Sequence, residues 1–487
     1  MRKKTVPSTD HQPLVFAVDR GSGKTLADQL TQSIETAILD GRLTAGARLA
    51  SWRDMASQLG VARGTVKVAY DRLIDRQLLV SHGPAGTRVS DHLPPRVPVE
   101  RRRPPHDPFQ TLGMTTPGAP PRVFQLGVPA EDAFPATTWS RLLVQASRKS
   151  AQLPLSYPDP RGELTLRRQI AAYLAVARSI VCHEEQIFIT TGFTAALGLI
   201  ADTLADGRRR AWVEDPGYPL ARAGLALKGI TVVPIPVDGE GLDVAYGIAH
   251  APDASLAVVT PGQQAPLGMT MSLARRRALL DWAAASDAFI IEDDYLGELQ
   301  LKGRAAPALA SLDAEERVIH VGTFSKTISP ALRLGFLVAP PRLLDLILRR
   351  AMFLSPAPAA VTQMVVAAFL AEGHFLRHLR KMRRLYTERS DLLSSIAGTA
   401  MKERNGGGLA LILSLPDGAD DAAIARRARD LGLGPSPLSS WYADAPSARR
   451  GLLLGVTNVT AQSVASAWPV LQGAIMTDGS FGLNGGS

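Results

Sequence analysis

A lysine stands on a short loop of this 487-residue chain in a setting that suits carbonyl chemistry. Residues 318–335 read VIHVGTFSKTISPALRLG, which predicts a buried strand, a glycine break and then a tight loop that carries Lys326. An amine among small hydroxyl residues can form an imine with a carbonyl cofactor. The groups that could hold a phosphate on that cofactor are Thr323, Ser325 and Arg333. Taken by itself, the stretch is also compatible with an ordinary loop lysine beside a helix.

A second stretch favours the cofactor interpretation. Residues 290–295, IIEDDY, predict a buried strand that ends in acids, and Asp293 lies 33 residues before Lys326. Pyridoxal phosphate needs a carboxylate beside its pyridinium nitrogen, because the protonated ring then works as an electron sink. Aspartate, lysine and arginine at the ends of strands in one α/β sheet would supply all three roles.

These motifs resemble those of a known family. Their spacing is similar to that of the fold-type I, aspartate-aminotransferase-like domain that binds pyridoxal phosphate. The wording of the motifs, from about residue 26 to about residue 459, resembles MocR-type regulators, the GntR branch that joins a DNA-binding head to an aminotransferase-like body. The resemblance implies Lys326 as the Schiff-base lysine, Asp293 at the pyridine nitrogen and Tyr295 near the ring oxygen. It implies a phosphate site formed by Thr323, Ser325 and Arg333.

Further cofactor contacts are expected on other loops. Residues 187–190 predict a strand, and the turn after it opens a helix expected to begin at Ala195. Backbone N–H groups at a helix start can bind a phosphate, which adds Gly192, Phe193 and Thr194 to the candidate site. By resemblance, Tyr218 lies near the cofactor, and Gln263 replaces the family's histidine in the segment TPGQQAPLG. Ala265 stands where aminotransferases place an asparagine that bonds the ring hydroxyl.

Two more expectations come from the resemblance. The segment around Tyr157 resembles one whose tyrosine reaches the phosphate of the neighbouring subunit, which implies a homodimer with sites shared between subunits. Taken by itself, this segment is a Pro/Gly turn before a helix. Arg450 lies where aminotransferases carry an arginine that pairs with the carboxylate of the substrate. Arg449 is the alternative at that place.

Composition narrows the class of protein. The single cysteine, Cys182, excludes an internal disulfide framework, fits a reducing cytosol and argues against a thiol metal site, so no metal ligands are expected. No apolar run is long enough to cross a bilayer. The basic N-terminus is not followed by the apolar stretch of a signal peptide, so the sequence predicts a cytoplasmic protein.

The net charge is concentrated near the N-terminus. The chain carries +9, from 54 Lys and Arg against 45 Asp and Glu. Residues 1–103 contain 17 basic and 10 acidic side chains, so they carry +7 and the remainder carries +2. A basic head on a nearly neutral body favours a polyanionic partner for the head. A solvated basic surface without a partner is the other interpretation.

The first 90 residues predict a winged helix-turn-helix. Apolar periodicity predicts helices over residues 26–39 and 63–76, and Ser51 to Asp54 has the form of a capping box that opens a short helix between them. Two short strands around a glycine turn follow and form the wing. This order places the start of the third helix against DNA. The candidate DNA contacts are Arg53, Arg63, Gly64, Thr65, Lys67, Tyr70, His82, Gly86 and Thr87.

The head resembles the GntR winged helix, with two departures. Ala62 replaces the usual serine cap of the recognition helix, and Gly64 replaces a common asparagine. Loss of the cap costs about 1 kcal/mol of local helix stability. Any base contact at Gly64 must come from the backbone, so the operator sequence is expected to differ from that of relatives. A small three-helix adaptor that binds protein is the lesser alternative.

Four segments are therefore expected. They are a DNA-binding head over residues 1–90, a Pro/Arg-rich linker over 91–122, an aminotransferase-like effector and dimerisation domain over 123–475, and a disordered tail over 476–487. In the body, apolar strands alternate with helical segments, which predicts an α/β architecture with a largely parallel sheet and a smaller C-terminal α+β part.

Three functions remain open on sequence grounds. The first is a regulator that uses pyridoxal phosphate to sense an amino compound, or the cofactor itself, and binds double-stranded operator DNA. The second is an active aminotransferase that carries a DNA-binding head. The third is a DNA-binding protein whose body only dimerises, which leaves the joint presence of Asp293, Tyr295, Lys326 and Arg333 unexplained. The missing asparagine at Ala265 favours the first.

Overall fold

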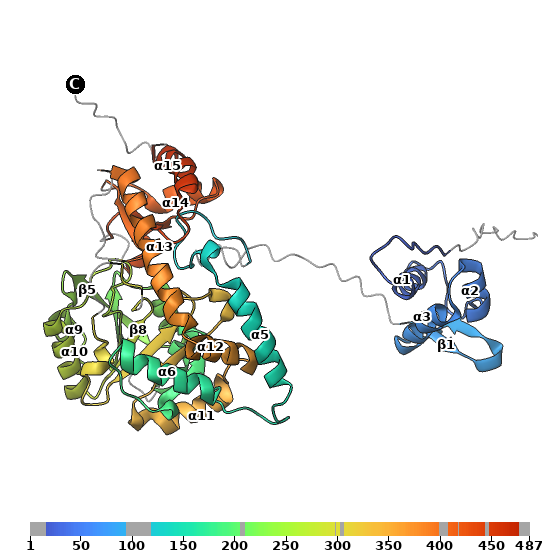
Figure 1. Cartoon of the computed structure of the whole chain (residues 1–487), viewed down its shortest axis with the longest axis horizontal. Coiled ribbons are helices and arrows are strands. Elements are labelled where there is room, and N and C mark those ends of the chain that lie inside the picture. The colour runs from blue at the N-terminus through green and yellow to red at the C-terminus, as the bar shows by residue number, and fades with distance from the viewer. Residues whose placement is uncertain are drawn as a thin grey trace, which may run out of the picture. The chain divides into compact units, whose positions relative to one another are not determined.

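The computed structural model describes residues 16–93, 118–204, 210–297, 299–301, 306–398, 408–416, 418–443 and 448–476. Contacts divide the chain into two compact units, a head within residues 1–116 and a body within residues 117–487 (Figure 1). The first 15 residues, most of the expected linker and the expected tail from residue 477 lie outside the described residues.

The head contains three helices and a two-stranded wing. Helix α1 (Leu26–Leu39) begins after Thr25, and α2 (Trp52–Leu59) begins after Ser51, whose hydroxyl accepts the N–H of Asp54 at 3.2 Å. Helix α3 (Arg63–Asp75) begins after Ala62 without a side-chain cap, as the sequence predicted. Strands β1 (Leu79–Ser81) and β2 (Thr87–Val89) pair antiparallel and form the wing. The core of the head is formed by apolar side chains that include Leu30, Ile34, Val66, Leu73 and Leu79.

The body is built on an eight-stranded sheet with the order β3-β10-β9-β8-β7-β4-β5-β6. Strands β4, β5, β7, β8 and β9 run parallel, whereas β10 is antiparallel to both of its neighbours, β3 and β9. The carboxyl ends of the parallel strands therefore meet at one edge of the sheet, where α/β proteins place their ligand sites. The strands are β3 (Ile187–Thr190), β4 (Arg210–Asp215), β5 (Thr231–Asp238), β6 (Gly241–Leu242), β7 (Leu256–Val259), β8 (Phe289–Asp294), β9 (Val318–Thr323) and β10 (Gly335–Val338).

Helices cover both faces of this sheet (Figure 1). Side chains alternate along β3, so that Ile187 and Ile189 pack in one apolar core and Phe188 packs in another. The first core receives α5 (Ala136–Ser150), α6 (Leu164–Ala177) and α12 (Ala360–Ala371), and the second receives α7 (Phe193–Thr203), α8 (Pro219–Leu227) and α11 (Leu344–Leu354). Helices α9 (Val244–His250) and α10 (Leu273–Ala285) surround a third core that contains Trp212.

A smaller lobe completes the body. Strands β11 (Ala410–Ser414), β13 (Gly451–Gly455) and β12 (Ser436–Pro437) form an antiparallel sheet that packs against α14 (Asp421–Asp430) and α15 (Ala461–Met476). Helix α13 (His374–Ala397) belongs to both parts, because Phe375 and Tyr386 pack in the core of the main sheet and Leu393 packs in the core of the lobe. This confirms the expected α/β body with a smaller α+β part.

Among the described residues, the helices are too short or too polar to cross a bilayer.

Candidate cofactor site and DNA-binding surface

Lys326 lies on the loop between β9 and β10 and reaches the segment that opens the body. The two strands pair with Thr323 opposite Gly335, and the Ser325 N–H donates to the Thr323 hydroxyl at 3.1 Å, which shapes the turn. The Nζ of Lys326 donates to the carbonyl oxygen of Gly127 at 2.8 Å. A Cβ on Gly127 would lie 2.9 Å from that Nζ, and the φ of this glycine is +76°, so a larger residue there would be strained and would displace the amine.

Asp293 lies on the neighbouring strand β8, in register with Val321 of β9. Its side chain is buried, and no hydrogen bond or ion pair joins its carboxylate to the described residues. Burial, and then the charge of Asp294, raise the pKa of Asp293 well above its usual value, whereas Lys326 lowers it. Burial lowers the pKa of Lys326, and the charge of Asp293 raises it. The amine and the carboxyl therefore lie within electrostatic range of each other.

A buried charge network fixes β8 from the opposite side. Glu292 and Asp294 point away from Asp293, because side chains alternate along a strand. Asp294 accepts from Arg178 at 2.6 Å, and a Glu292 oxygen lies 3.0 Å from Nδ1 of His320. Glu292 also accepts two backbone N–H groups, from Leu309 and Ala310. These contacts hold the strand that presents Asp293.

Arg333 and the start of α7 form an anion cradle. Gly192 caps this helix with a φ of +107°, and a Cβ added to it would lie 3.9 Å from Nη2 of Arg333. Arg333 itself adopts a left-handed conformation with a φ of +47°, which is uncommon for a residue with a side chain. Helix α7 begins at Phe193, two residues before the expected start, so the N–H groups of its first turn lie beside a guanidinium.

Aromatic rings line the same region. Tyr218 lies with its ring centroid 5.9 Å from that of Phe193 and 5.9 Å from that of Trp441. Burial raises the pKa of Tyr218 to about 12, with a further increase from Asp293 and a decrease from Arg333. Burial also raises the pKa of Tyr295, and the charge of Asp293 adds to the effect. Both phenols thus lie near the Asp293 carboxyl and stay protonated.

Two glutamines follow β7, and they differ in their partners. Gln264 donates to the backbone oxygens of Pro216 and Ala265 at 2.7 and 2.9 Å. Gln263 is buried, and its Oε1 has no hydrogen-bond partner among the described residues. Nearby, burial raises the pKa of Glu214 to about 7, against the lowering effect of its hydrogen bonds from Thr260. Gln263 therefore offers an unsatisfied acceptor.

The structure describes two further expected site residues. Arg450 directly precedes β13, and its Nη1 lies 3.7 Å from Oδ1 of the fully buried Asp421 in the smaller lobe, so its role toward an effector stays a prediction. Tyr157 is fully exposed. Its expected role needs a second subunit and stays a prediction.

The grouped residues fit pyridoxal phosphate. Lys326 offers an amine, Asp293 a buried carboxyl that no described residue hydrogen-bonds, and Arg333 with Gly192 an anion cradle. Sequence reasoning missed Gly127 and Trp441, which reach the site through contacts between distant parts of the chain. The segment FQLG, which precedes the first helix of the body, is the local sequence pattern that could have indicated Gly127.

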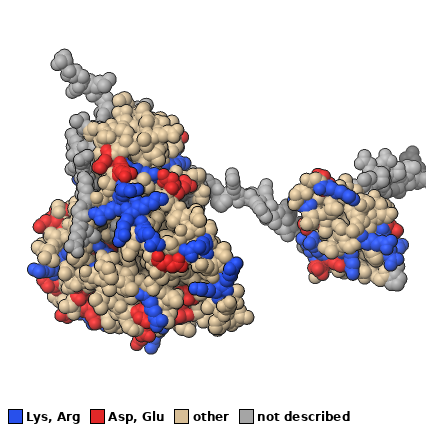
Figure 2. All heavy atoms as spheres, in the orientation of Figure 1, with Lys and Arg blue, Asp and Glu red and all other residues tan. Residues whose placement is uncertain are grey.

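The head presents most of its expected DNA contacts at the surface. Arg63, Gly64 and Lys67 are exposed at the start of α3, and Figure 2 shows basic side chains on the head. Arg53 is exposed and lies 4.9 Å from the centroid of the Trp52 ring. Of the remaining candidates, His82 is exposed and Thr65, Gly86 and Thr87 are half-buried.

Tyr70 requires a correction. Only 3% of this residue is exposed, and its hydroxyl donates to the carbonyl oxygen of Ala50 at 2.9 Å. It packs in the core of the head because it occupies the inner face of α3, together with Val66 and Leu73. Tyr70 therefore supports the recognition helix from behind, and we leave it out of the proposed DNA contacts.

Two family models match the chain. The GntR family of bacterial regulatory proteins matches residues 26–89, and the class I and II aminotransferases match residues 132–415. The chain is 34% identical to a probable rhizopine catabolism regulatory protein, MocR, of Rhizobium meliloti, over 95% of this chain and 96% of that protein. It is 33% identical to the pyridoxine biosynthesis regulator PdxR of Corynebacterium glutamicum, over 91% of this chain and 94% of that protein.

Solved structures resemble the body. Kynurenine aminotransferase of Pyrococcus horikoshii matches with a TM-score of 0.66 and 25% identity, over 78% of this chain and 98% of that protein. An archaeal alanine:glyoxylate aminotransferase matches with a TM-score of 0.68 and 24% identity, over 76% and 93% of the two chains. The chain joins a GntR head to an aminotransferase-like body, and its relatives match it over nearly their full length. It therefore belongs to the MocR-type regulators of the GntR family.

Proposed function

We propose that this protein is a transcription regulator that holds pyridoxal phosphate at Lys326 and senses an amino compound, or the cofactor itself, while its winged helix binds operator DNA. The observation that carries the proposal is the grouping of Lys326, Asp293 and the Arg333–Gly192 cradle in a chain with a GntR head. Operator binding places a bacterial regulator in the cytoplasm, where the DNA is.

Different site residues would bind different parts of the cofactor. Pyridoxal phosphate would supply a carbonyl carbon that bonds to an amine and a ring that withdraws electrons. The lowered pKa of Lys326 favours the neutral amine, which is the nucleophilic form. The raised pKa of Asp293 lets its carboxyl share a proton with a ring nitrogen. Arg333, Thr323, Ser325 and the N–H groups of Gly192, Phe193 and Thr194 would hold the phosphate. Tyr218, Tyr295 and Gln263 would complete the pocket.

A homodimer is part of the proposal. Large apolar side chains are exposed in the segment between α5 and α6, at Leu153, Leu155 and Tyr157. Contact with a second copy would bury them away from water. In the proposed dimer, Tyr157 reaches the phosphate of the other subunit. An effector carboxylate at Arg450 would have to share or replace the contact of that arginine with Asp421.

Aminotransferase activity is the second candidate. Its support is the fold likeness to kynurenine aminotransferase, whose structure contains substrates and products. Against it stands Ala265, a buried side chain that cannot hydrogen-bond, at the position where the resemblance expects an asparagine. A site without that bond stabilises charge on the cofactor less well, which favours sensing over rapid turnover.

The first prediction concerns Lys326→Ala. The visible absorption band of protein purified with pyridoxal phosphate should disappear, because this side chain supplies the amine that meets the carbonyl carbon. Borohydride treatment followed by peptide mass analysis should label residue 326 of the wild type and no residue of the variant. Lys149→Ala, which removes an exposed lysine of α5, is the control and should keep the band. A variant that keeps a reducible band at wild-type intensity would refute the assignment.

The second prediction concerns Asp293→Asn. Loss of a charged hydrogen bond to the cofactor ring costs about 1.5–3 kcal/mol, or roughly 10- to 100-fold in affinity. Equilibrium dialysis with pyridoxal phosphate should show that weakening, while borohydride still labels Lys326. Asp345→Asn, which changes an exposed carboxylate of α11, is the control. Affinity equal to or tighter than that of the wild type would remove Asp293 from its role.

The third prediction concerns the recognition helix. Arg63→Ala and Lys67→Ala should each weaken operator binding, because both side chains are exposed at the start of α3. Loss of a residue that contacts only phosphate should reduce the salt slope by about one. Loss of a residue that reads a base should also relax specificity, by about 1–3 kcal/mol at one base pair. Fluorescence anisotropy over a salt series measures both. Unchanged affinity in the double variant would place the DNA on another surface of the head.

A further inference from the structure

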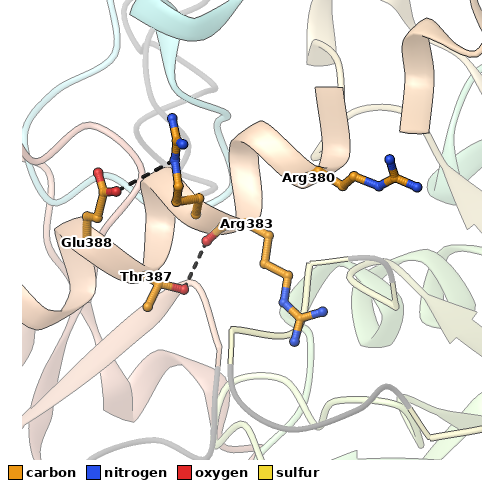
Figure 3. A pocket seen from close by; sticks show the side chains of 5 residues that line it. Arg380, Arg383, Thr387 and Glu388 are labelled. Carbon is orange, nitrogen blue, oxygen red and sulfur yellow. Dashed lines mark hydrogen bonds and ion pairs between the residues drawn. The ribbon is translucent and has the colours of Figure 1, made fainter. Parts of the chain in front are cut away.

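A basic patch lies on α13, far along the chain from the DNA-binding head. Arg380, Arg383 and Arg384 line a surface depression together with Thr387 and Glu388. Figure 3 shows the side chains of Arg380 and Arg383 extending away from the helix. The proposed function does not use any of these five residues. We call Arg380, Arg383 and Arg384 the α13 patch.

The patch is the outward face of an amphipathic helix. Leu379, Met382 and Tyr386 are buried on the inward face, whereas the three arginines are exposed. The helix carries six basic side chains against two acidic ones over 24 residues. Figure 2 shows a cluster of basic side chains in the middle of the body's visible face. Apolar packing determines the inward positions, but it does not require arginines on the outward face.

The acidic neighbour Glu388 is a weak competitor for the patch. Nε of Arg384 lies 3.7 Å from Oε1 of Glu388, and both side chains are largely exposed. An exposed pair of this kind contributes little to stability, so a denser anion can compete with Glu388 for Arg384. Like charges four residues apart also repel one another. An anionic partner would relieve that repulsion.

The spacing of the charges suits a polyanion. Arg380 and Arg384 are separated by about 6 Å along the helix axis, from a rise of 1.5 Å per residue. Duplex DNA carries one charge per about 1.7 Å of its axis, so several phosphates can face such a row at once. Arginine also matches phosphate oxygens with paired donors. An open, exposed row lacks the enclosure that a small carboxylate effector would need.

We propose that the α13 patch binds the phosphate backbone of DNA that flanks the sequence read by the head. This inference rests on the proposed operator binding by the head. The tether allows it, because the 24 residues between Leu93 and Gly118 can extend at most about 80 Å. That reach corresponds to about 24 base pairs at 3.4 Å each. The body thus adds affinity that depends on the length of the DNA and not on its sequence.

The test uses the full-length, cofactor-loaded protein and two duplexes. A short duplex covers only the site protected by the head, and a long one adds about 30 base pairs of unrelated sequence on each side. The variant is Arg380→Ala/Arg383→Ala/Arg384→Ala. The matched control is Arg277→Ala/Arg349→Ala/Arg350→Ala, which removes three exposed arginines from α10 and α11. Anisotropy is measured for each protein from 50 to 200 mM salt.

The patch variant should lose affinity for the long duplex only. If all three arginines contact phosphates, the salt slope on the long duplex falls by about 2.7, which is roughly a 40-fold change across that range. Binding to the short duplex should match the wild type, and so should both duplexes with the control variant. Failure of every protein to bind the short duplex would instead contradict operator binding by the head.

Three results would overturn the patch assignment. The wild type could bind both duplexes with the same salt slope, or the control variant could lose as much slope as the patch variant. The patch variant could also keep its full slope and change only its self-association in sedimentation velocity. That last result would identify the α13 patch as a contact between copies of the protein.

Discussion

A buried carboxylate is costly unless a positive group faces it, and this constraint governs the body. Asp293 has no hydrogen-bonding partner among the described residues, and the amine of Lys326 lies within electrostatic range of it. Each group shifts the pKa of the other, while burial raises the pKa of Asp293 and lowers the pKa of Lys326. Such a pair is poised to bind a molecule with a basic ring nitrogen and a carbonyl group. The parallel order of β8 and β9 and the charge network behind Asp294 maintain that pairing.

Helix α13 connects this site to the rest of the body. His378, on its inward face, lies with Nε2 2.8 Å from the carbonyl oxygen of Thr327, the residue after Lys326. Further along, Tyr386 accepts the N–H of Ala130 at 2.8 Å, and the end of the helix packs in the core of the smaller lobe. The same helix therefore touches the lysine loop and both lobes, and it carries the α13 patch. A change at the site that moves this helix would also move the patch.

The sequence predicted the parts of the fold that depend on local patterns. Helix α1 has the expected bounds, Ser51 caps α2, β8 carries the expected acid, and β9 leads into the loop that carries the expected lysine. Local patterns could not show contacts between distant segments. Gly127 lies 199 residues before Lys326, and tertiary packing brings the two together. The pairing of Arg450 with Asp421 has the same cause. The burial of Tyr70, by contrast, follows the apolar periodicity of α3.

We propose that amine binding at Lys326 and DNA binding by the head are coupled. Linkage requires reciprocity, so operator DNA must change amine affinity by the factor with which the amine changes operator affinity. The direct measurement is to titrate candidate amines into cofactor-loaded protein, with and without operator, and to follow both the absorption spectrum and DNA anisotropy. We predict equal factors of roughly 5- to 150-fold for at least one amine or for pyridoxal phosphate itself. Rapid repeated production of an oxo acid, with operator affinity indifferent to every amine and to the cofactor, would contradict the account.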